Sequence, residues 1–537
     1  MFNVLKCSLL TAVAGLFLAH TLRAADGING NLVTVQWLDQ HLHDPDLLVL
    51  DASPVPAYAA KHIRGAVSVN IFALYGREEA SFDDTEKLLQ SWGVSSDKKI
   101  VMYDQGGSIV ATRVFFSLYS NGFPAEHLFI LDGGLFHWQQ EGLPVAKDNT
   151  PAAKPGSFKI QRRSRDAKSD LPEFLTASGD PANNVLIDAL DPDWHFGETL
   201  ALTKPGHIPR GILLPSADFY SPDHTFKSPE EITKMLAYFH IRPEQRIYTY
   251  CGGGVAASVP WFALKFILNY PTVKLYTGSE LEWLSDERDL PYWTYDAPFF
   301  MRESNWLQFW SAHMPRAVGI AHVSIVDLRP ADAFGQGHVP FASNVPREVF
   351  QSSVTNPGKL AEILGQAGVN ASDEAVVISG AGLTPDAALA FVMLESLGQK
   401  RVSIFIDSMD QWARRGFSVT KEPAAAGASI YRGDPRKNVI ISDATTTHGM
   451  YPKVFIASGQ DLPSKAQDGK VVHLPYTELL NNDGTPKPAK DIWKILVKAG
   501  VPRYAELVCL ADNPGEAAVN YFVLKLMGYP DVKVLVL

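Results

Sequence analysis

The chain has 537 residues, of which 46% are apolar and 20% are charged. This is the composition of an ordinary globular protein with material for roughly three to four domains. Its 48 basic residues are outnumbered by 58 acidic ones, and the formal charge of -10 argues against a general nucleic-acid binder. Any anionic substrate must therefore be held by local groups.

The first 24 residues have the layout of a secretory signal peptide. Lys6 precedes an apolar run that reaches Leu18, and Ala24 ends the segment. The run is too short for a comfortable membrane span and no other stretch is long enough. We therefore expect an exported, periplasmic protein with no membrane span after processing. Cys7 precedes the apolar run instead of marking the cleavage point, which argues against a lipoprotein.

Four copies of one pattern follow, each about the length of a domain. Each copy is expected to begin with an apolar strand that ends in Asp, at residues 47–51, 185–188, 323–327 and 439–443. In the first three copies a His precedes a second strand, at His62, His207 and His338. The first three copies close with a strand and a turn that contains Trp, at Trp138, Trp283 and Trp412, and the fourth is expected to stop short of this strand. Because the His recurs in copies without a thiol, we expect it to serve a turn structurally.

The central strand of the second copy leads into a loop that carries a cysteine. Residues 247–250 are predicted to form a buried strand and residues 256–268 a helix, with Cys251 and three glycines opening the loop between them. Free amides at a helix start favour a thiolate, so Cys251 is predicted to ionise easily. A cysteine packed in an ordinary strand–turn–helix connection gives the same local pattern.

The other loops lack a cysteine at this position and carry Asp104, Ser379 and Ala511 instead. Serine lacks the chemistry of a thiolate and alanine has no nucleophile, so the third and fourth copies are predicted to be scaffold. Ser379 as a serine nucleophile would need a base, and no nearby His stands out. Cys509 lies in an apolar strand and is predicted to be packed there, which leaves Cys251 as the reactive thiol of the mature chain.

Strands and helices alternate with short connections, which predicts an α/β fold of tandem domains, each a small parallel sheet with helices on both faces. Ligands bind such sheets beyond the carboxyl ends of the strands, where Cys251 falls. Residues 147–170 and 420–428 have the composition of linkers. The predicted organisation is a signal peptide over 1–24 and domains over 28–148, 168–296, 305–420 and 430–537.

These features together resemble the rhodanese family, the sulfurtransferases of thiosulfate and 3-mercaptopyruvate, over essentially the whole mature length. The matching motifs are the Asp-ended strand, Gly-His-Ile-Pro at 206–209, the Cys251 loop, and Asp-Gly-Gly with Trp at 132–138. In tandem members an inactive domain with Asp at the loop start precedes the domain with the active Cys, and Asp104 and Cys251 fit these places. The resemblance implies an enzyme that needs no metal and no organic cofactor.

The resemblance implies that Cys251 takes a sulfane sulfur from thiosulfate, holds it as a persulfide and passes it to cyanide or a thiol. The persulfide would be stabilised by the backbone of Gly252, Gly253, Gly254, Val255 and Ala256. Arg210 is the candidate cation for a sulfonate or carboxylate, with a solvated arginine on a turn as the alternative.

The loop composition leaves the donor open. Thiosulfate-type members often place basic residues after the cysteine, whereas Gly252 is closer to the 3-mercaptopyruvate type; Ala256, however, replaces the Thr usual there. Phosphatases related to this fold need an arginine six residues after the cysteine, and Ala257 occupies that position. The excess of copies without a thiol leaves a non-catalytic persulfide carrier or scaffold as an alternative.

Overall fold

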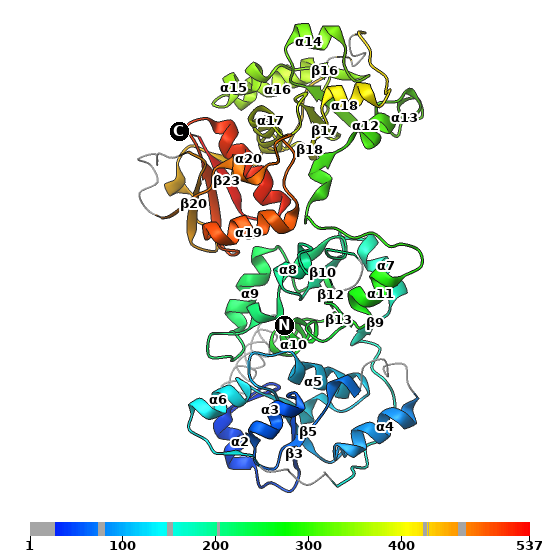
Figure 1. Ribbon diagram of the computed structural model, residues 1–537, viewed down its shortest axis with the longest axis vertical. Helices are drawn as coiled ribbons and strands as arrows, with labels where there is room; N and C mark the ends of the chain where they lie inside the picture. The colour runs from blue at the N-terminus through cyan, green and yellow to red at the C-terminus, as the bar shows by residue number, and fades with distance from the viewer. Residues whose placement is uncertain are drawn as a thin grey trace, which may run out of the picture. The chain divides into compact units, whose positions relative to one another are not determined.

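The computed structural model describes residues 27–73, 81–147, 154–200, 204–422, 427, 429–459 and 469–536, so the predicted signal peptide lies outside it. The chain divides into two compact units, Met1–Tyr292 and Trp293–Leu537. Each unit contains two mainly parallel sheets flanked by helices, which confirms the predicted fold class (Figure 1). Among the described residues, no helix is long and apolar enough to cross a membrane.

Four sheets of the described residues share one order of strands, in which the central strand lies between the closing strand and the strand that takes the place of the predicted Asp-ended strand. A fifth sheet has only two antiparallel strands, β4 (His62–Ile63) and β8 (Val145–Ala146). The first sheet runs β1 (Ile28–Asn29), β2 (Leu32–Val33), β7 (Leu128–Leu131), β6 (Lys99–Tyr103), β3 (Leu47–Asp51), β5 (Val67–Ser68). The second runs β9 (Lys168–Ser169), β13 (Val273–Tyr276), β12 (Arg246–Tyr250), β10 (Asn184–Asp188), β11 (Gly211–Leu213). The third runs β14 (Met301–Arg302), β18 (Arg401–Phe405), β17 (Glu374–Ile378), β15 (Val323–Asp327), β16 (Ala342–Asn344). The fourth runs β19 (Ile440–Ile441), β23 (Val532–Leu535), β22 (Glu506–Leu510), β20 (Lys453–Ala457), β21 (Lys470–His473).

Helices connect these strands. The first unit contains α2 (Val35–His41), α3 (Val55–Ala60), α4 (Phe82–Ser91), α5 (Val110–Ser120), α6 (Gly134–Gln140), α7 (Leu171–Gly179), α8 (Pro192–His195), α9 (Pro229–Tyr238), α10 (Ser258–Phe262) and α11 (Ser279–Ser285). The second contains α12 (Ser304–Trp310), α13 (His313–Ala317), α14 (Ala331–Gln336), α15 (Arg347–Ser353), α16 (Pro357–Gln366), α17 (Pro385–Ser396), α18 (Met409–Arg414), α19 (Ala489–Ala499) and α20 (Pro514–Leu526). Several begin at a side chain that caps the first turn, as Ser228 does for α9.

The recurring His side chains have the same structural role in the first three copies. Each ring is buried, and its Nδ1 lies 2.8–3.0 Å from a backbone oxygen of the preceding helix: His62 from Tyr58, His207 from His195 and His338 from Phe334. Each ring also stacks on the side chain of the same partner. The prediction of a structural turn role is therefore confirmed.

Three details differ from those predicted, two strands of the fourth copy and the start of the third. Residues 439–443 do not hold the Asp-ended strand of the fourth copy: β19 is an edge strand paired with β23, and β20 occupies the Asp position. The fourth sheet does have its closing strand, β23. The third sheet starts at β14, before residue 305. A short apolar run does not distinguish an edge strand from a central one, because pairing partners are remote in sequence.

Within each unit, the helices that follow the two central strands pack against each other. In the first unit α5 contacts α10, with Phe115 and Phe262 edge to face at 4.9 Å. In the second unit α17 contacts α20, with Phe391 and Phe522 at 5.0 Å (Figure 1). The predicted helix over 256–268 is present in two parts, because α10 continues as a π-helix over Ala263–Ile267. This pairing brings the loops before the helices close to the junction of the two copies.

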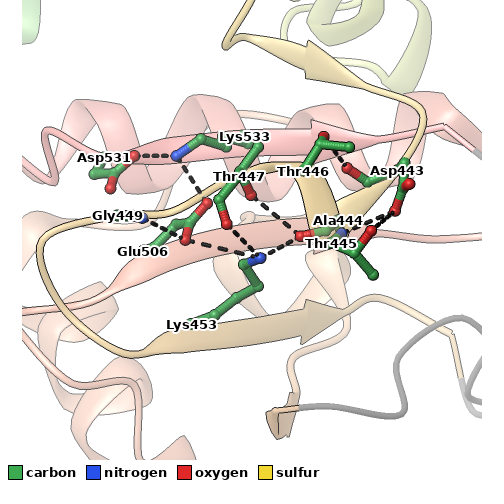
Figure 2. A network of polar contacts seen from close by, with 10 residues as sticks. All are labelled: Asp443, Ala444, Thr445, Thr446, Thr447, Gly449, Lys453, Glu506, Asp531 and Lys533. Atoms are coloured by element: carbon green, nitrogen blue, oxygen red, sulfur yellow. Dashed lines mark hydrogen bonds and ion pairs between the residues drawn. The ribbon is translucent and has the colours of Figure 1, made fainter.

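Buried charges hold the amino end of the fourth sheet together (Figure 2). Glu506 begins β22 and is 1% exposed, and its carboxylate lies 3.2 Å from the ammonium of Lys533 in β23. The Gly449 amide donates to Glu506 at 2.9 Å, and Lys533 also pairs with Asp531. Burial acts to raise the pKa of Glu506, but hydrogen bonds from Thr447, Gly449 and Lys533 outweigh it and lower that pKa.

We expect Glu506→Gln to lower the free energy of unfolding by about 3 kcal/mol at pH 7, because Lys533 then lacks its buried carboxylate partner. A lowered folded-state pKa means that the stabilisation is present above the ordinary value of 4.5 and is lost as the pH falls below it. Hydrogen exchange of peptides covering β20, β22 and β23 measures the effect. Asp512→Asn, an exposed change beyond β22, should leave exchange unchanged; equal exchange in both variants would refute the role given to Glu506.

Candidate functional site

Cys251 follows the central strand of the second sheet at its carboxyl end, as predicted. In the parallel register Tyr250 of β12 lies opposite Asp188 of β10, so both strands end at the same level. The predicted strand over 247–250 is confirmed, with β12 starting one residue earlier. The Cys251 side chain is buried, with 2% of its surface exposed. It lies beyond the carboxyl ends of the strands, where sheets of this kind bind ligands.

A hydrogen bond joins the loop backbone to the sulfur. The Gly254 amide donates to Cys251 Sγ at 3.0 Å, and Gly254 has φ +81°, a value that side chains make costly. A Cβ at Gly254 would also lie 2.9 Å from the backbone oxygen of Thr277. The loop therefore needs glycine at this position to hold its amide on the sulfur.

The first turn of α11 fixes the back of the loop. The Cys251 amide donates to Ser279 Oγ at 3.1 Å, and the amides of Glu280 and Leu281 donate to the backbone oxygens of Cys251 and Gly252 at 3.0 and 2.9 Å. Ser279 has φ +51° and its hydroxyl donates to Tyr276 O at 2.8 Å. None of these α11 contacts was predicted, because α11 lies far along the chain from the loop.

The other predicted loop residues divide into two groups. The Gly253 amide is directed towards the sulfur, as is that of Ala257, which lies one residue beyond the predicted set. Val255 and Ala256 instead form the turn that leads into α10, since their carbonyls accept bonds from the amides of Ser258 and Val259. The amides of Gly253, Gly254 and Ala257 thus form a cradle of backbone donors for the sulfur, as the glycine-rich composition suggested.

Burial controls the ionisation of the thiol. Removal from water raises the pKa of Cys251 above its ordinary value; the amides of Ala257, Gly253 and Gly254 act in the opposite direction, and the charge of Asp188 raises it further. The prediction of an easily ionised thiol is therefore wrong for the resting protein. The local sequence shows the amides but neither the depth of burial nor the carboxylate on the adjacent strand.

The first copy completes the site. Arg113 of α5 is 2% exposed and donates from Nη1 to Gly254 O at 3.1 Å. Thr112 Oγ1 lies 2.8 Å from the hydroxyl of Ser258, at the start of α10. A guanidinium of one copy therefore holds the backbone of the other copy's loop, and the two copies act as one structural unit around Cys251.

Arg210 does not reach this site. It precedes β11, whose Gly211 lies opposite Leu186, so Arg210 is near the amino end of the sheet. Four residues of strand, about 13 Å, separate that level from Cys251. Its guanidinium donates to Ser178 O at the end of α7, which agrees with an arginine on an exposed turn and not with the predicted anion-binding role.

The cradles of the first and third copies are filled by their own side chains. The two carboxylate oxygens of Asp104 each accept one amide at 2.9 Å, from Gly106 and from Ala111. The Ser379 hydroxyl donates to Gly382 O at 2.7 Å and accepts from the Ala381 amide. In both copies the side chain at the loop start thus accepts amides of its own loop, and the inactive roles of these copies stay predictions.

The remaining cysteine, Cys509, is fully buried within β22 between Ile456 and Val534 of the neighbouring strands. Burial raises the pKa of its thiol strongly. Cys509 is therefore a packed apolar residue, as predicted.

Comparison with models of known protein families identifies the family of this chain. The model of the Rhodanese-like domain matches residues 34–141, 171–286 and 314–415, together more than half of the chain. The chain belongs to the rhodanese family. The second match contains the Cys251 loop, and the first and third contain the loops of Asp104 and Ser379.

Three curated rhodanese relatives each align with about half of the chain. The sulfur carrier protein TtuD of Thermus thermophilus is 29% identical over 47% of this chain and 93% of its own length. A probable 3-mercaptopyruvate sulfurtransferase of Pseudomonas aeruginosa is 31% identical over 48% and 97%. A Mycobacterium bovis protein named for thiosulfate sulfurtransferase activity is 29% identical over 47% and 94%. Among solved structures, the 3-mercaptopyruvate enzyme SseA of Escherichia coli is 26% identical with a TM-score of 0.42, over 47% of this chain and 99% of its own.

Two neighbouring glycines allow a matched test of the cradle. We expect Gly254→Ala to reduce sulfur transfer about tenfold or more, since a left-handed alanine costs about 1–2 kcal/mol even before the contact with Thr277. Gly252→Ala should stay within about twofold of wild type, because a Cβ there meets nothing closer than Leu190 at 4.0 Å. Thiocyanate formation measures both, and equal rates in the two variants would contradict the cradle.

Proposed function

We propose that the chain is a sulfurtransferase in which Cys251 carries a sulfane sulfur as a persulfide between a small anionic donor and a thiol or cyanide acceptor. The observation that carries this proposal is the Gly254 amide on Sγ of Cys251, in a cradle whose other copies lack a thiol. The same amides that meet the thiol can stabilise the terminal sulfur anion of a persulfide.

With thiosulfate as donor, the Cys251 thiolate attacks the outer sulfur, a new S–S bond forms, and the bond to the sulfonate sulfur breaks with release of sulfite. Cyanide then attacks the outer sulfur of the persulfide, which gives thiocyanate and restores the thiolate. A thiol acceptor would leave as a persulfide instead. Each half-reaction balances without a metal or organic cofactor, because the cysteine itself holds the transferred atom.

A specific observation favours 3-mercaptopyruvate as a second donor. The charge of Asp188 acts on the Cys251 thiol, and the loop after Cys251 has no basic residue. Such a site disfavours a dianion such as thiosulfate more than a single carboxylate. Attack on the thiol sulfur would break its C–S bond, move the thiol proton to carbon and release pyruvate.

We expect Cys251→Ala to reduce thiocyanate formation from thiosulfate, and pyruvate formation from 3-mercaptopyruvate, to the uncatalysed background. Wild-type activity should rise as the pH increases through the raised pKa of Cys251, because only the thiolate attacks. Ser379→Ala, the matched change in the third copy, should keep full activity.

Mass spectrometry of the Cys251 peptide separates the alternatives. A persulfide without turnover from either donor would identify a carrier supplied by a protein partner. Absence of both persulfide and turnover in wild type would overturn the proposed function. Export to the periplasm stays a prediction, and fractionation of the full-length protein tests it.

A further inference from the structure

Arg113 is a buried arginine by which the first copy reaches the Cys251 loop of the second. It lies near the start of α5, is 2% exposed, and donates from Nη1 to Gly254 O at 3.1 Å. Its guanidinium also lies over the ring of Phe116, with Cζ 5.1 Å from the ring centroid. Removing a guanidinium from water is costly, so packing alone does not favour an arginine at this position.

The helices that follow the other three loops have an apolar residue at the corresponding position. Arg113 lies eight residues before the residue that ends α5, and the residues at the same distance in α17 and α20 are Leu389 and Val519, both buried. Counted from the two hydroxyls that meet between α5 and α10, the corresponding residue of α10 is Val259, which is also buried. The fold therefore accepts a hydrophobic side chain here, and the arginine occurs in the helix that faces the thiol loop.

Arg113 and its neighbour Thr112 support two consecutive carbonyls of that loop. Arg113 bonds Gly254 O directly. Thr112 Oγ1 lies 2.8 Å from Ser258 Oγ, which in turn donates to Val255 O at 2.6 Å. The end of the loop, where the chain turns into α10, is thus fastened to two side chains of the first copy, one of them through a hydroxyl of α10.

Gly254 is the residue through which this anchoring reaches the sulfur. Its amide donates to Cys251 Sγ at 3.0 Å, while its carbonyl accepts from Arg113. A glycine has no side chain to restrict its backbone angles, so bonds on its two peptide groups help to fix how they are turned. Hydrogen bonds from a charged donor are stronger than neutral ones, which makes the guanidinium an effective anchor for this carbonyl.

We propose that Arg113 is a positioning residue for sulfur transfer: its guanidinium fixes the Gly254 carbonyl and thereby keeps the Gly254 amide directed at the Cys251 sulfur, and at the persulfide formed on it. The inference rests on the proposed role of Cys251 as the sulfur carrier. Because Arg113 acts on the loop backbone, its loss should slow transfer much more than it weakens donor binding. The first copy thus contributes a side chain to the reaction although its own loop carries Asp104.

The test compares Arg113→Met with Arg163→Met in the full chain. Arg163 is a matched control, because its bonds to Asn121 Oδ1 and Thr85 Oγ1 lie within the first copy. Arg113→Met should lower kcat for thiocyanate formation about tenfold or more and leave KM for thiosulfate within about threefold. Arg163→Met should keep kcat within about twofold of wild type. If wild type uses only 3-mercaptopyruvate, pyruvate formation gives the same comparison.

Chemical rescue separates positioning from a general effect on folding. Free guanidinium, at concentrations too low to denature the protein, should restore part of the kcat of Arg113→Ala, because it can occupy the space of the missing group. Arg113→Lys keeps the charge but loses the planar donors, so its kcat should lie between those of Arg113→Met and wild type.

Hydrogen exchange of the peptide that covers residues 251–257 needs no sulfur donor. Exchange should be faster in Arg113→Met than in wild type, and unchanged in Arg163→Met. Faster exchange in a protein that shows neither turnover nor a persulfide would reject the sulfur-transfer proposal and retain the anchoring role of Arg113.

Unchanged exchange in Arg113→Met, or faster exchange with an unchanged kcat, would overturn the inference. An equal loss of kcat in Arg163→Met would overturn it too, because the effect would then not depend on the contact with Gly254. If Arg113→Met does not fold, Arg113→Lys decides the question through the same exchange and kcat measurements.

Discussion

The hydrogen bond from the Gly254 amide to the Cys251 sulfur is the contact on which the rest of the site depends. It requires a left-handed residue at Gly254, a carbonyl there held by Arg113, and a loop fastened to the first turn of α11. Each requirement is met by a different element of the first unit. Residues of both copies in the first unit therefore contribute to the cradle.

Burial and backbone donors change the pKa of the Cys251 thiol in opposite directions. Removal from water favours the neutral thiol, and the amides favour any anion in their place, whether thiolate or persulfide. The charge of Asp188 adds to the effect of burial on the thiol. In the proposed persulfide the negative charge lies on the outer sulfur, and backbone donors that are already in place can stabilise that charge without reorganisation.

The repeats show how one cradle is used in different ways. Asp104 fills the first cradle with its own carboxylate, and His224 of the second copy lies across it, with Nδ1 2.8 Å from Gly106 O and its ring stacked on Phe136. Ser379 satisfies the third cradle internally. In the second unit the loop of the fourth copy approaches the third in a similar way, through the Leu383 amide and Gly484 O. Copies without a thiol thus support the interfaces.

The sequence by itself determined the α/β class, the repeated order of strand, loop and helix, and the identity of Cys251, because hydrophobic periodicity and glycine positions are local properties. It also indicated the structural roles of His207 and Cys509. Only the tertiary structure decided that Arg210 lies near the far end of the sheet, that β19 is an edge strand, and that burial raises the pKa of the Cys251 thiol. Those properties depend on strand register and on burial by segments remote in the chain, and a local pattern carries neither.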